Sequence, residues 1–268
     1  MTSSTLERIG KGDFFLIAGP CVIESEKLCF DVAEHLLRIT GDRNLPLVFK
    51  ASFKKANRLS ANSYSGPGME QGLATLARIK NEFGLPILTD VHETSDIGPV
   101  AEVADILQIP AFLCRQTDLV NIAAKTGRWV NIKKGQFLAP EDMDKLVAKA
   151  HGANVMVTER GSSFGYRNLV VDFRSLLIMK QPGRPVVFDV THSLQLPGGG
   201  GDVSTGQPQY AIPMARAAMA VGVDGLFVET HPKPAEALSD AGAMLPLSEM
   251  ERLLDAVLEI PTAERPHV

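Results

Sequence analysis

Eight short apolar runs, each followed by charged or polar residues, constrain this chain more than any other feature. A stretch with helical periodicity follows each run. Almost wholly apolar runs are typical of parallel strands, because both faces of such a sheet are covered. Eight strand–helix units predict a single (β/α)8 (TIM) barrel, which gathers the polar strand ends on one rim. The runs cover residues 14–21, 47–58, 86–93, 106–116, 130–136, 155–161, 186–193 and 226–231.

The length and the segments between the runs support this fold. The chain has 268 residues, and one such barrel typically needs about 250. We therefore expect one catalytic domain over 1–268, with the barrel at about 14–260 between short polar tails. Val32, Leu36 and Ile39 recur at helical spacing, so they give one helix an apolar stripe for packing. The expected helices cover 25–40, 68–84, 95–104, 117–126, 140–150, 172–180, 210–221 and 247–260.

Composition excludes several classes of partner. The formal net charge of −4 gives no reason to expect a nucleic-acid partner. No apolar run approaches the ~18 residues of a membrane span, and the first residues lack the apolar core of a signal peptide. Three cysteines do not make a disulfide framework. We therefore expect a cytoplasmic protein that acts on small molecules, without a nucleic-acid or membrane partner.

Basic residues gather at the ends of four runs. Taken alone, the cluster after the second run is equally compatible with a solvated surface loop. Convergence from four strand ends favours a substrate with phosphate and carboxylate groups, because arginine suits phosphate and lysine supplies a point charge. Asp90, at the end of the third run, could accept a hydrogen bond from a sugar hydroxyl. The basic residues are Lys50, Lys54, Lys55, Arg58, Arg115, Lys133, Lys134 and Arg160.

Four potential metal ligands lie near other strand ends. Cys21 ends the first run, His192 the seventh and Glu229 the eighth, and Asp240 lies in the following loop. Each has an ordinary alternative, as a buried thiol, a hydrogen-bonded imidazole or a helix-capping acid. The first and eighth strands of a closed barrel are neighbours, however, and together the four would suit Fe²⁺, Zn²⁺ or Mn²⁺. Both interpretations remain open from the residues alone.

A glycine-rich segment follows the seventh run. Four consecutive glycines lie within residues 196–209, and we expect no regular structure there because glycine loses the most backbone entropy on ordering. A phosphate-binding loop is excluded, since the segment lacks a Gly-Lys-Ser/Thr ending. It is either a mobile loop that covers the site or a flexible connection.

The strand ends together resemble those of 3-deoxy-D-manno-octulosonate 8-phosphate synthases. The resemblance runs from about residue 14 to 260 and includes IAGPC at 17–21, KASFKKANR at 50–58, TDVHE at 89–93 and NIKKGQF at 131–137. That family condenses phosphoenolpyruvate with arabinose 5-phosphate, releases phosphate and serves lipopolysaccharide biosynthesis. The resemblance implies a (β/α)8 barrel that is usually a homotetramer.

The resemblance also implies a divalent metal ion. One branch of the family carries cysteine and needs a metal, whereas the other carries asparagine at that position. Cys21 places this chain in the metal-dependent branch. The implied ligands are Cys21, His192, Glu229 and Asp240.

Roles for the remaining candidates follow from the same motifs. Asn57 and Arg58 would hold arabinose 5-phosphate, with Asp90 near its hydroxyls. Arg115 would reach the sugar phosphate in its own or in a neighbouring subunit. Phosphoenolpyruvate would be surrounded by Lys50, Lys55, Lys133, Gln136 and Arg160. We expect the catalytic set to be Lys50, Asp90, Lys133, Arg160 and His192.

Three rival functions remain open. The related 3-deoxy-7-phosphoheptulonate synthases of the shikimate pathway use erythrose 4-phosphate, but they typically read KPRT where this chain reads KANR. A Schiff-base aldolase would use Lys50 or Lys133 as its nucleophile. A non-catalytic barrel would bind the sugar phosphate without releasing phosphate.

Overall fold

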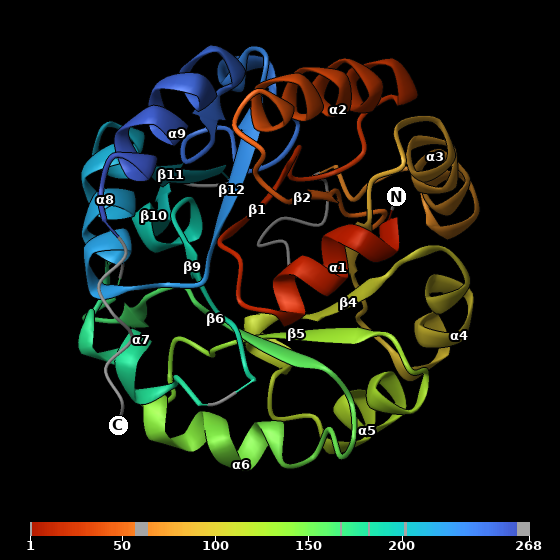
Figure 1. The fold of residues 1–268 in the computed structure, drawn as a ribbon, viewed down its shortest axis with the longest axis vertical. Helices are drawn as coiled ribbons and strands as arrows, with labels where there is room; N and C mark the ends of the chain where they lie inside the picture. The colour runs from red at the N-terminus through yellow and green to blue at the C-terminus, as the bar shows by residue number, and fades with distance from the viewer. Residues whose placement is uncertain (1, 57–63, 167, 182, 201–202, 262–268) are drawn as a thin grey trace.

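The computed structural model describes residues 2–56, 64–166, 168–181, 183–200 and 203–261. Eight parallel strands form a closed barrel, and the last strand pairs with the first (Figure 1). The predicted (β/α)8 barrel is thereby confirmed. In order around the barrel, the strands are β1 (Phe15–Gly19), β2 (Leu47–Lys50), β3 (Ile87–Asp90), β4 (Ile106–Ile109), β5 (Trp129–Lys133), β6 (Val155–Glu159), β9 (Val186–Asp189) and β12 (Gly225–His231).

Helices cover the outside of the barrel (Figure 1). The stripe of Val32, Leu36 and Ile39 is buried, and Ser25 caps the first of these helices by accepting a hydrogen bond from the Leu28 amide. Each expected helix exists, although those expected at 140–150 and 172–180 are only five residues long. The outer helices are α2 (Glu26–Gly41), α3 (Met69–Phe83), α4 (Thr94–Val103), α5 (Thr117–Lys125), α6 (Met143–Val147), α7 (Arg174–Ile178), α8 (Ala211–Val221) and α9 (Met250–Leu258).

An additional helix, α1 (Thr2–Gly10), lies across the amino-terminal end of the barrel (Figure 1). Leu6 and Ile9 are one turn apart and pack against the apolar barrel interior. This interior is filled by Phe15, Ile17, Val48, Leu88, Ile106, Met156, Val187 and Phe227. We expected only a polar tail here, since two apolar residues in a polar segment are a weak signal. With the barrel axis filled at this end, the barrel interior opens towards the carboxyl rim.

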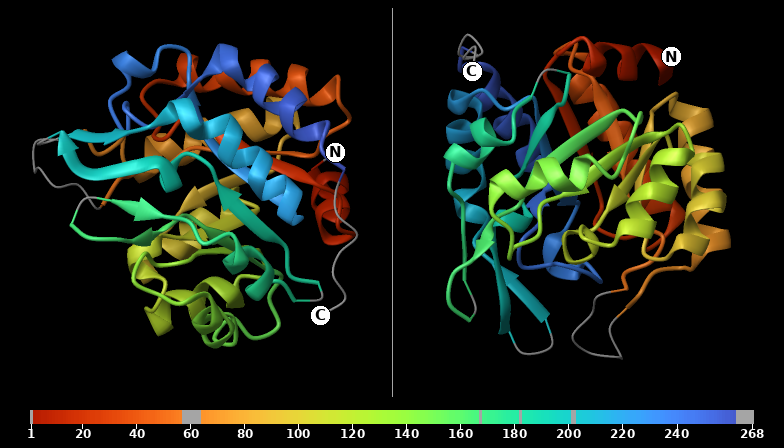
Figure 2. Two further views of the ribbon diagram at one scale, coloured as in Figure 1. Left: turned by 90° about the vertical axis from the view of Figure 1, so that its left-hand side faces the viewer. Right: turned by 90° about the horizontal axis from the view of Figure 1, so that it is seen from below.

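Two hairpins extend the carboxyl side of the barrel (Figure 2). One joins β7 (Ser162–Ser163) to β8 (Leu169–Val170), and the other joins β10 (Gln195–Gly200) to β11 (Val203–Gly206). A short strand, β13 (Leu245–Pro246), pairs with β12. The expectation of no regular structure in the glycine-rich segment is therefore wrong. Its two halves pair as antiparallel strands, and this pairing supplies backbone hydrogen bonds that the glycine content does not reveal.

Across the described residues, no helix combines the length and the apolar character that a membrane crossing requires.

Close packing at the base of the barrel yields a stability prediction. A Cβ atom at Gly225 would lie 2.7 Å from the fully buried ring of Phe15. Gly225→Ala should therefore lower the free energy of unfolding by about 1–3 kcal/mol. Gly41→Ala is the control, because a Cβ atom on that helical residue meets nothing within 4 Å. Urea denaturation followed by circular dichroism should find the control at least as stable as the wild type. Equal losses in both variants would contradict this packing.

Candidate active site

The alternation of strand side chains builds the site. On each strand, the residue two positions after an inward apolar residue also faces the barrel axis, one layer nearer the carboxyl rim. Phe227 belongs to the apolar interior, and Glu229 lies one layer above it. The same step leads from Val48 to Lys50, from Leu88 to Asp90, from Ile106 to Gln108, from Met156 to Thr158 and from Val187 to Asp189. A polar layer thus lies directly on the apolar one.

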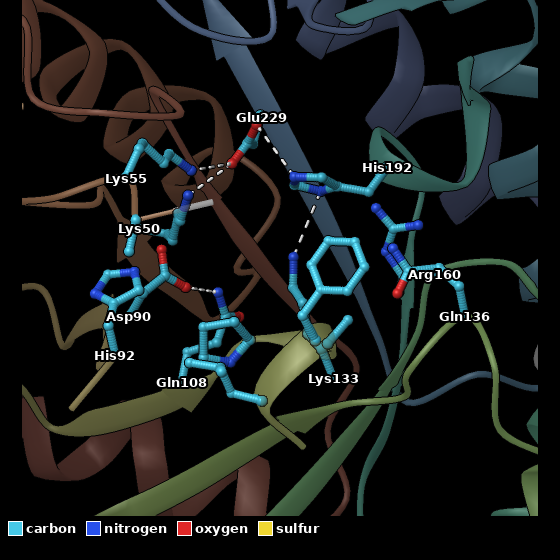
Figure 3. Close-up of a pocket in the computed structure, with 15 residues that line it drawn as sticks. Lys50, Lys55, Asp90, His92, Gln108, Lys133, Gln136, Arg160, His192 and Glu229 are labelled. Carbon is cyan, nitrogen blue, oxygen red and sulfur yellow. Dashed lines mark hydrogen bonds and ion pairs between the residues drawn. The ribbon is translucent and has the colours of Figure 1, made fainter. Parts of the chain in front are cut away.

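This polar layer forms the floor of a pocket at the rim (Figure 3). Four cationic side chains and two carboxylates line it, so the pocket carries excess positive charge and favours an anion. The cations are Lys50, Lys55, Lys133 and Arg160, and the carboxylates are Asp90 and Glu229.

Glu229 is the centre of the charge network in Figure 3. The Lys50 Nζ atom lies 2.6 Å from its Oε1 atom, and both side chains are at most 1% exposed. Lys55 Nζ lies 3.8 Å from Oε1, and His192 Nε2 lies 3.6 Å from Oε2. Burial would raise the pKa of Glu229, but Lys50, His192 and Lys55 outweigh burial and hold that pKa well below its usual range. Glu229 is therefore ionised and holds two lysines from the end of β2 beside the imidazole that follows β9.

Asp189 joins two of the predicted residues below the rim. Its Oδ2 atom lies 2.7 Å from Lys133 Nζ and 2.7 Å from His192 Nδ1. Burial lowers the pKa of Lys133, and Asp189 offsets this only in part. Our sequence reasoning missed Asp189, although a carboxylate at the end of a buried strand was a usable signal.

Arg160 and Gln136 present polar atoms without protein partners. Arg160 Nη2 donates to Gln195 Oε1 at 3.0 Å, and Gln195 Nε2 donates to Asp240 Oδ1 at 3.1 Å. Within the described part of the chain, the buried atoms Arg160 Nη1 and Gln136 Oε1 find no hydrogen-bond partner. Buried polar atoms are normally satisfied, so these two are suited to a ligand in the pocket.

Three of the four predicted metal ligands come together. The ligand atoms of Cys21, Glu229 and Asp240 all lie within 4.8 Å of one another. Cys21 Sγ donates to Asp240 Oδ2 at 2.8 Å, because burial, followed by Asp240 and Glu229, raises the pKa of the thiol. His192 Nε2 lies 3.6 Å from Glu229 Oε2, but His192 is not part of this group of three.

The group of three fits a borderline divalent ion. One thiol and two carboxylates are donors that Fe²⁺, Zn²⁺ or Mn²⁺ accepts. The buried Glu229 Oε2 atom has no hydrogen-bond partner among the described residues. Asp240 has a φ of 48°, an uncommon conformation for a residue other than glycine and one often found at functional sites.

The remaining predicted residues differ in their placement. Lys55 and Asp90 line the pocket, as expected. Arg115 is exposed and is not among the described residues that line the pocket. Asn57 and Arg58 lie outside the described residues. His92 and Gln108 line the pocket but were not among our predicted site residues. Gln108 lies within its strand rather than after it, so only its two-residue spacing from Ile106 could have revealed it.

Comparison with known proteins agrees with this arrangement. Residues 2–263 match the model of the DAHP synthetase I family. A 2-dehydro-3-deoxyphosphooctonate aldolase of Polaromonas sp. is 56% identical over 256 residues, which cover 92% of this chain and 90% of that protein. The protein of the same name from Aromatoleum aromaticum is 54% identical over 259 residues, with 95% and 93% covered. The resemblance read from the strand ends is confirmed, and the chain belongs to the DAHP synthetase I family.

Proposed function

We propose that the chain condenses phosphoenolpyruvate with D-arabinose 5-phosphate, giving 3-deoxy-D-manno-octulosonate 8-phosphate and phosphate for lipopolysaccharide biosynthesis. The observation that carries this proposal is the pocket with four cations and two carboxylates at the barrel rim. Both proposed substrates are anions, and their repulsion in a water-poor site needs such compensation. The name shared by relatives more than 50% identical supports the same reaction.

Phosphoenolpyruvate would use the buried cations. Its phosphate fits between Lys133, Gln136 and Arg160, where Arg160 Nη1 is a donor without a partner among the described residues. Its carboxylate fits beside Lys50 and Lys55, which Glu229 holds on one side of the pocket. An anion at this place would complete a charge cluster that is already desolvated, so little further reorganisation is needed.

Arabinose 5-phosphate would bind towards the outer part of the pocket. Asp90 is available to its hydroxyls, and Asn57 and Arg58 of the KANR motif would hold its phosphate end. In the reaction, C3 of phosphoenolpyruvate attacks the aldehyde carbon while water adds to C2. Cleavage of the C2–O bond then releases phosphate. Lys133 and Arg160 would stabilise the charge that develops on the departing phosphate.

A divalent ion would be held by Cys21, Glu229 and Asp240, with His192 as a fourth ligand. When bound, such an ion acts as a Lewis acid towards oxygen ligands. The donor set and the unpartnered Glu229 oxygen support this assignment.

Location and assembly complete the proposal. A cytoplasmic location agrees with three buried cysteines, all of which are free thiols. Assembly as a homotetramer agrees with exposed aromatic residues, because Phe112, Phe137 and Phe164 are each more than half exposed. In such an assembly Arg115 would reach the pocket of a neighbour.

Substrate choice is tested by phosphate release. With phosphoenolpyruvate, arabinose 5-phosphate should give phosphate and the eight-carbon product, whereas erythrose 4-phosphate should be turned over at least tenfold more slowly. The reverse preference would make the chain a heptulonate synthase.

Borohydride added during turnover should trap no substrate on the protein. A covalent adduct on Lys133, whose lowered pKa suits a Schiff base, would instead establish the aldolase mechanism.

Metal binding is tested by direct metal analysis. Dialysis of the chelated protein against Zn²⁺ or Mn²⁺ should restore about one ion per chain, together with activity. Cys21→Ala should lower metal affinity by at least tenfold, because replacing a residue that only hydrogen-bonds to a metal ligand already lowers affinity about tenfold or more. Cys29→Ala is the matched control, since Cys29 is equally buried but lies on helix α2. Full turnover in metal-free protein, or equal metal loss in both variants, would refute the assignment.

A further inference from the structure

Five buried side chains from neighbouring strands are joined by a continuous series of hydrogen bonds beneath the pocket. Thr158 Oγ1 donates to Asn131 Oδ1 at 2.7 Å, and Asn131 Nδ2 donates to Gln108 Oε1 at 2.9 Å. Gln108 Nε2 then donates to Asp90 Oδ1, and Ser52 donates to Asp90 Oδ2. We call these five residues the polar belt. Each is at most 6% exposed.

The direction of every hydrogen bond in the polar belt follows from Asp90. Burial would raise the pKa of Asp90, but Lys50 and Lys55 outweigh burial and hold that pKa far below its usual range. The carboxylate is then an acceptor only, so Gln108 must present its NH₂ group to it. The Gln108 oxygen consequently faces Asn131, which must donate, and the Asn131 oxygen requires the hydroxyl proton of Thr158.

Only one part of the polar belt reaches the pocket. Asp90 and Gln108 line it, whereas Asn131 and Thr158 are absent from the described lining (Figure 3). Buried polar groups stabilise a fold little compared with apolar packing, and they are valuable mainly when they fix one arrangement. Among the described residues, the side chains of Asn131 and Thr158 form hydrogen bonds only within the polar belt, so orienting Gln108 is the effect that these bonds produce.

We propose that Asn131 and Thr158 are positioning residues for the aldose phosphate, because they lock the amide of Gln108 and thereby hold the Asp90 carboxylate towards the sugar hydroxyls. The inference rests on the proposed function for its substrate. It assigns a role to two residues that touch neither substrate in the proposed arrangement.

Thr158 offers a matched pair of variants. Thr158→Val keeps the shape of the side chain but removes the hydroxyl, whereas Thr158→Ser keeps the hydroxyl. Loss of one buried hydrogen bond typically corresponds to about a fivefold change in an equilibrium constant. We therefore expect Thr158→Val to raise the KM for arabinose 5-phosphate about fivefold and leave the KM for phosphoenolpyruvate within twofold. Thr158→Ser should restore the wild-type value.

Thr89→Val controls for the loss of a buried hydroxyl in general. Thr89 is fully buried, and its hydroxyl donates to the Ala51 carbonyl rather than to the polar belt. It should leave the KM for arabinose 5-phosphate unchanged.

Asn131→Asp tests the direction of the hydrogen bonds through pH. The introduced carboxyl can donate to the Gln108 oxygen only while protonated, and burial raises the pKa of such a group. The variant should approach wild-type affinity for the aldose phosphate at low pH and lose it as pH rises through about 5 to 8. The charged and titratable groups that act on Asp90 are Lys50, Lys55, His92 and Lys133. All four are also present in the wild type. The ratio of the variant's affinity for the aldose phosphate to that of the wild type, followed across pH, therefore reports the titration of the introduced carboxyl.

The outcomes separate this inference from the proposed function. If the wild type releases no phosphate with arabinose 5-phosphate, the proposed function fails. The polar belt is then tested without substrate, by hydrogen exchange of the Gln108 side-chain amide, which Thr158→Val should accelerate and Thr158→Ser should not. If the wild type is active, the inference is overturned when Thr158→Val matches Thr158→Ser and Thr89→Val. Should Asn131→Asp fail to fold, the Thr158 pair decides the question alone.

Discussion

The buried ion pair between Lys50 and Glu229 is the interaction on which the candidate site depends. The two charged atoms lie 2.6 Å apart, and neither side chain is more than 1% exposed. Such a pair is weak evidence for stability, because removing both charges from water costs several kcal/mol. Its value here is geometric. One Glu229 oxygen holds Lys50 and approaches Lys55, while the other lies 3.6 Å from His192, and the same carboxylate belongs to the proposed metal group.

The fold keeps these charges in place from below. Helix α1 and the apolar interior fill the amino end, so the polar layer rests on side chains that cannot move aside. Asp189 ties Lys133 to His192 on one side, and the polar belt fixes Asp90 on the other. The pocket is therefore prepared for anions before any substrate arrives, which is how electrostatic catalysis avoids reorganisation during the reaction.

Strand alternation explains how much of this the sequence could predict. The eight strands, and most charged residues at their ends, follow from apolar runs and the barrel rule, so Lys50, Lys133 and Glu229 were identifiable. Contacts between distant segments were not. Cys21 and Asp240 are 219 positions apart, and only barrel closure and the loop after β12 bring them together. Barrel closure allowed this grouping from the residues, and the family resemblance favoured it over the ordinary alternatives.

The failures have equally physical causes. The hairpin of β10 and β11 depends on antiparallel pairing between the two halves of the glycine-rich segment, which composition alone does not reveal. Helix α1 depends on the apolar end of a barrel that its own residues do not encode. Gln108 was missed because it lies inside a strand, where polar residues are usually absent.

Anomalous X-ray diffraction from a crystal containing phosphoenolpyruvate and Mn²⁺ tests the central claim, that one carboxylate organises both the metal and the anion sites. The account predicts a Mn²⁺ peak bounded by Cys21, Glu229 and Asp240, with the phosphate of phosphoenolpyruvate against Arg160 and Lys133. A peak elsewhere, or a phosphate bound away from these cations, would contradict it.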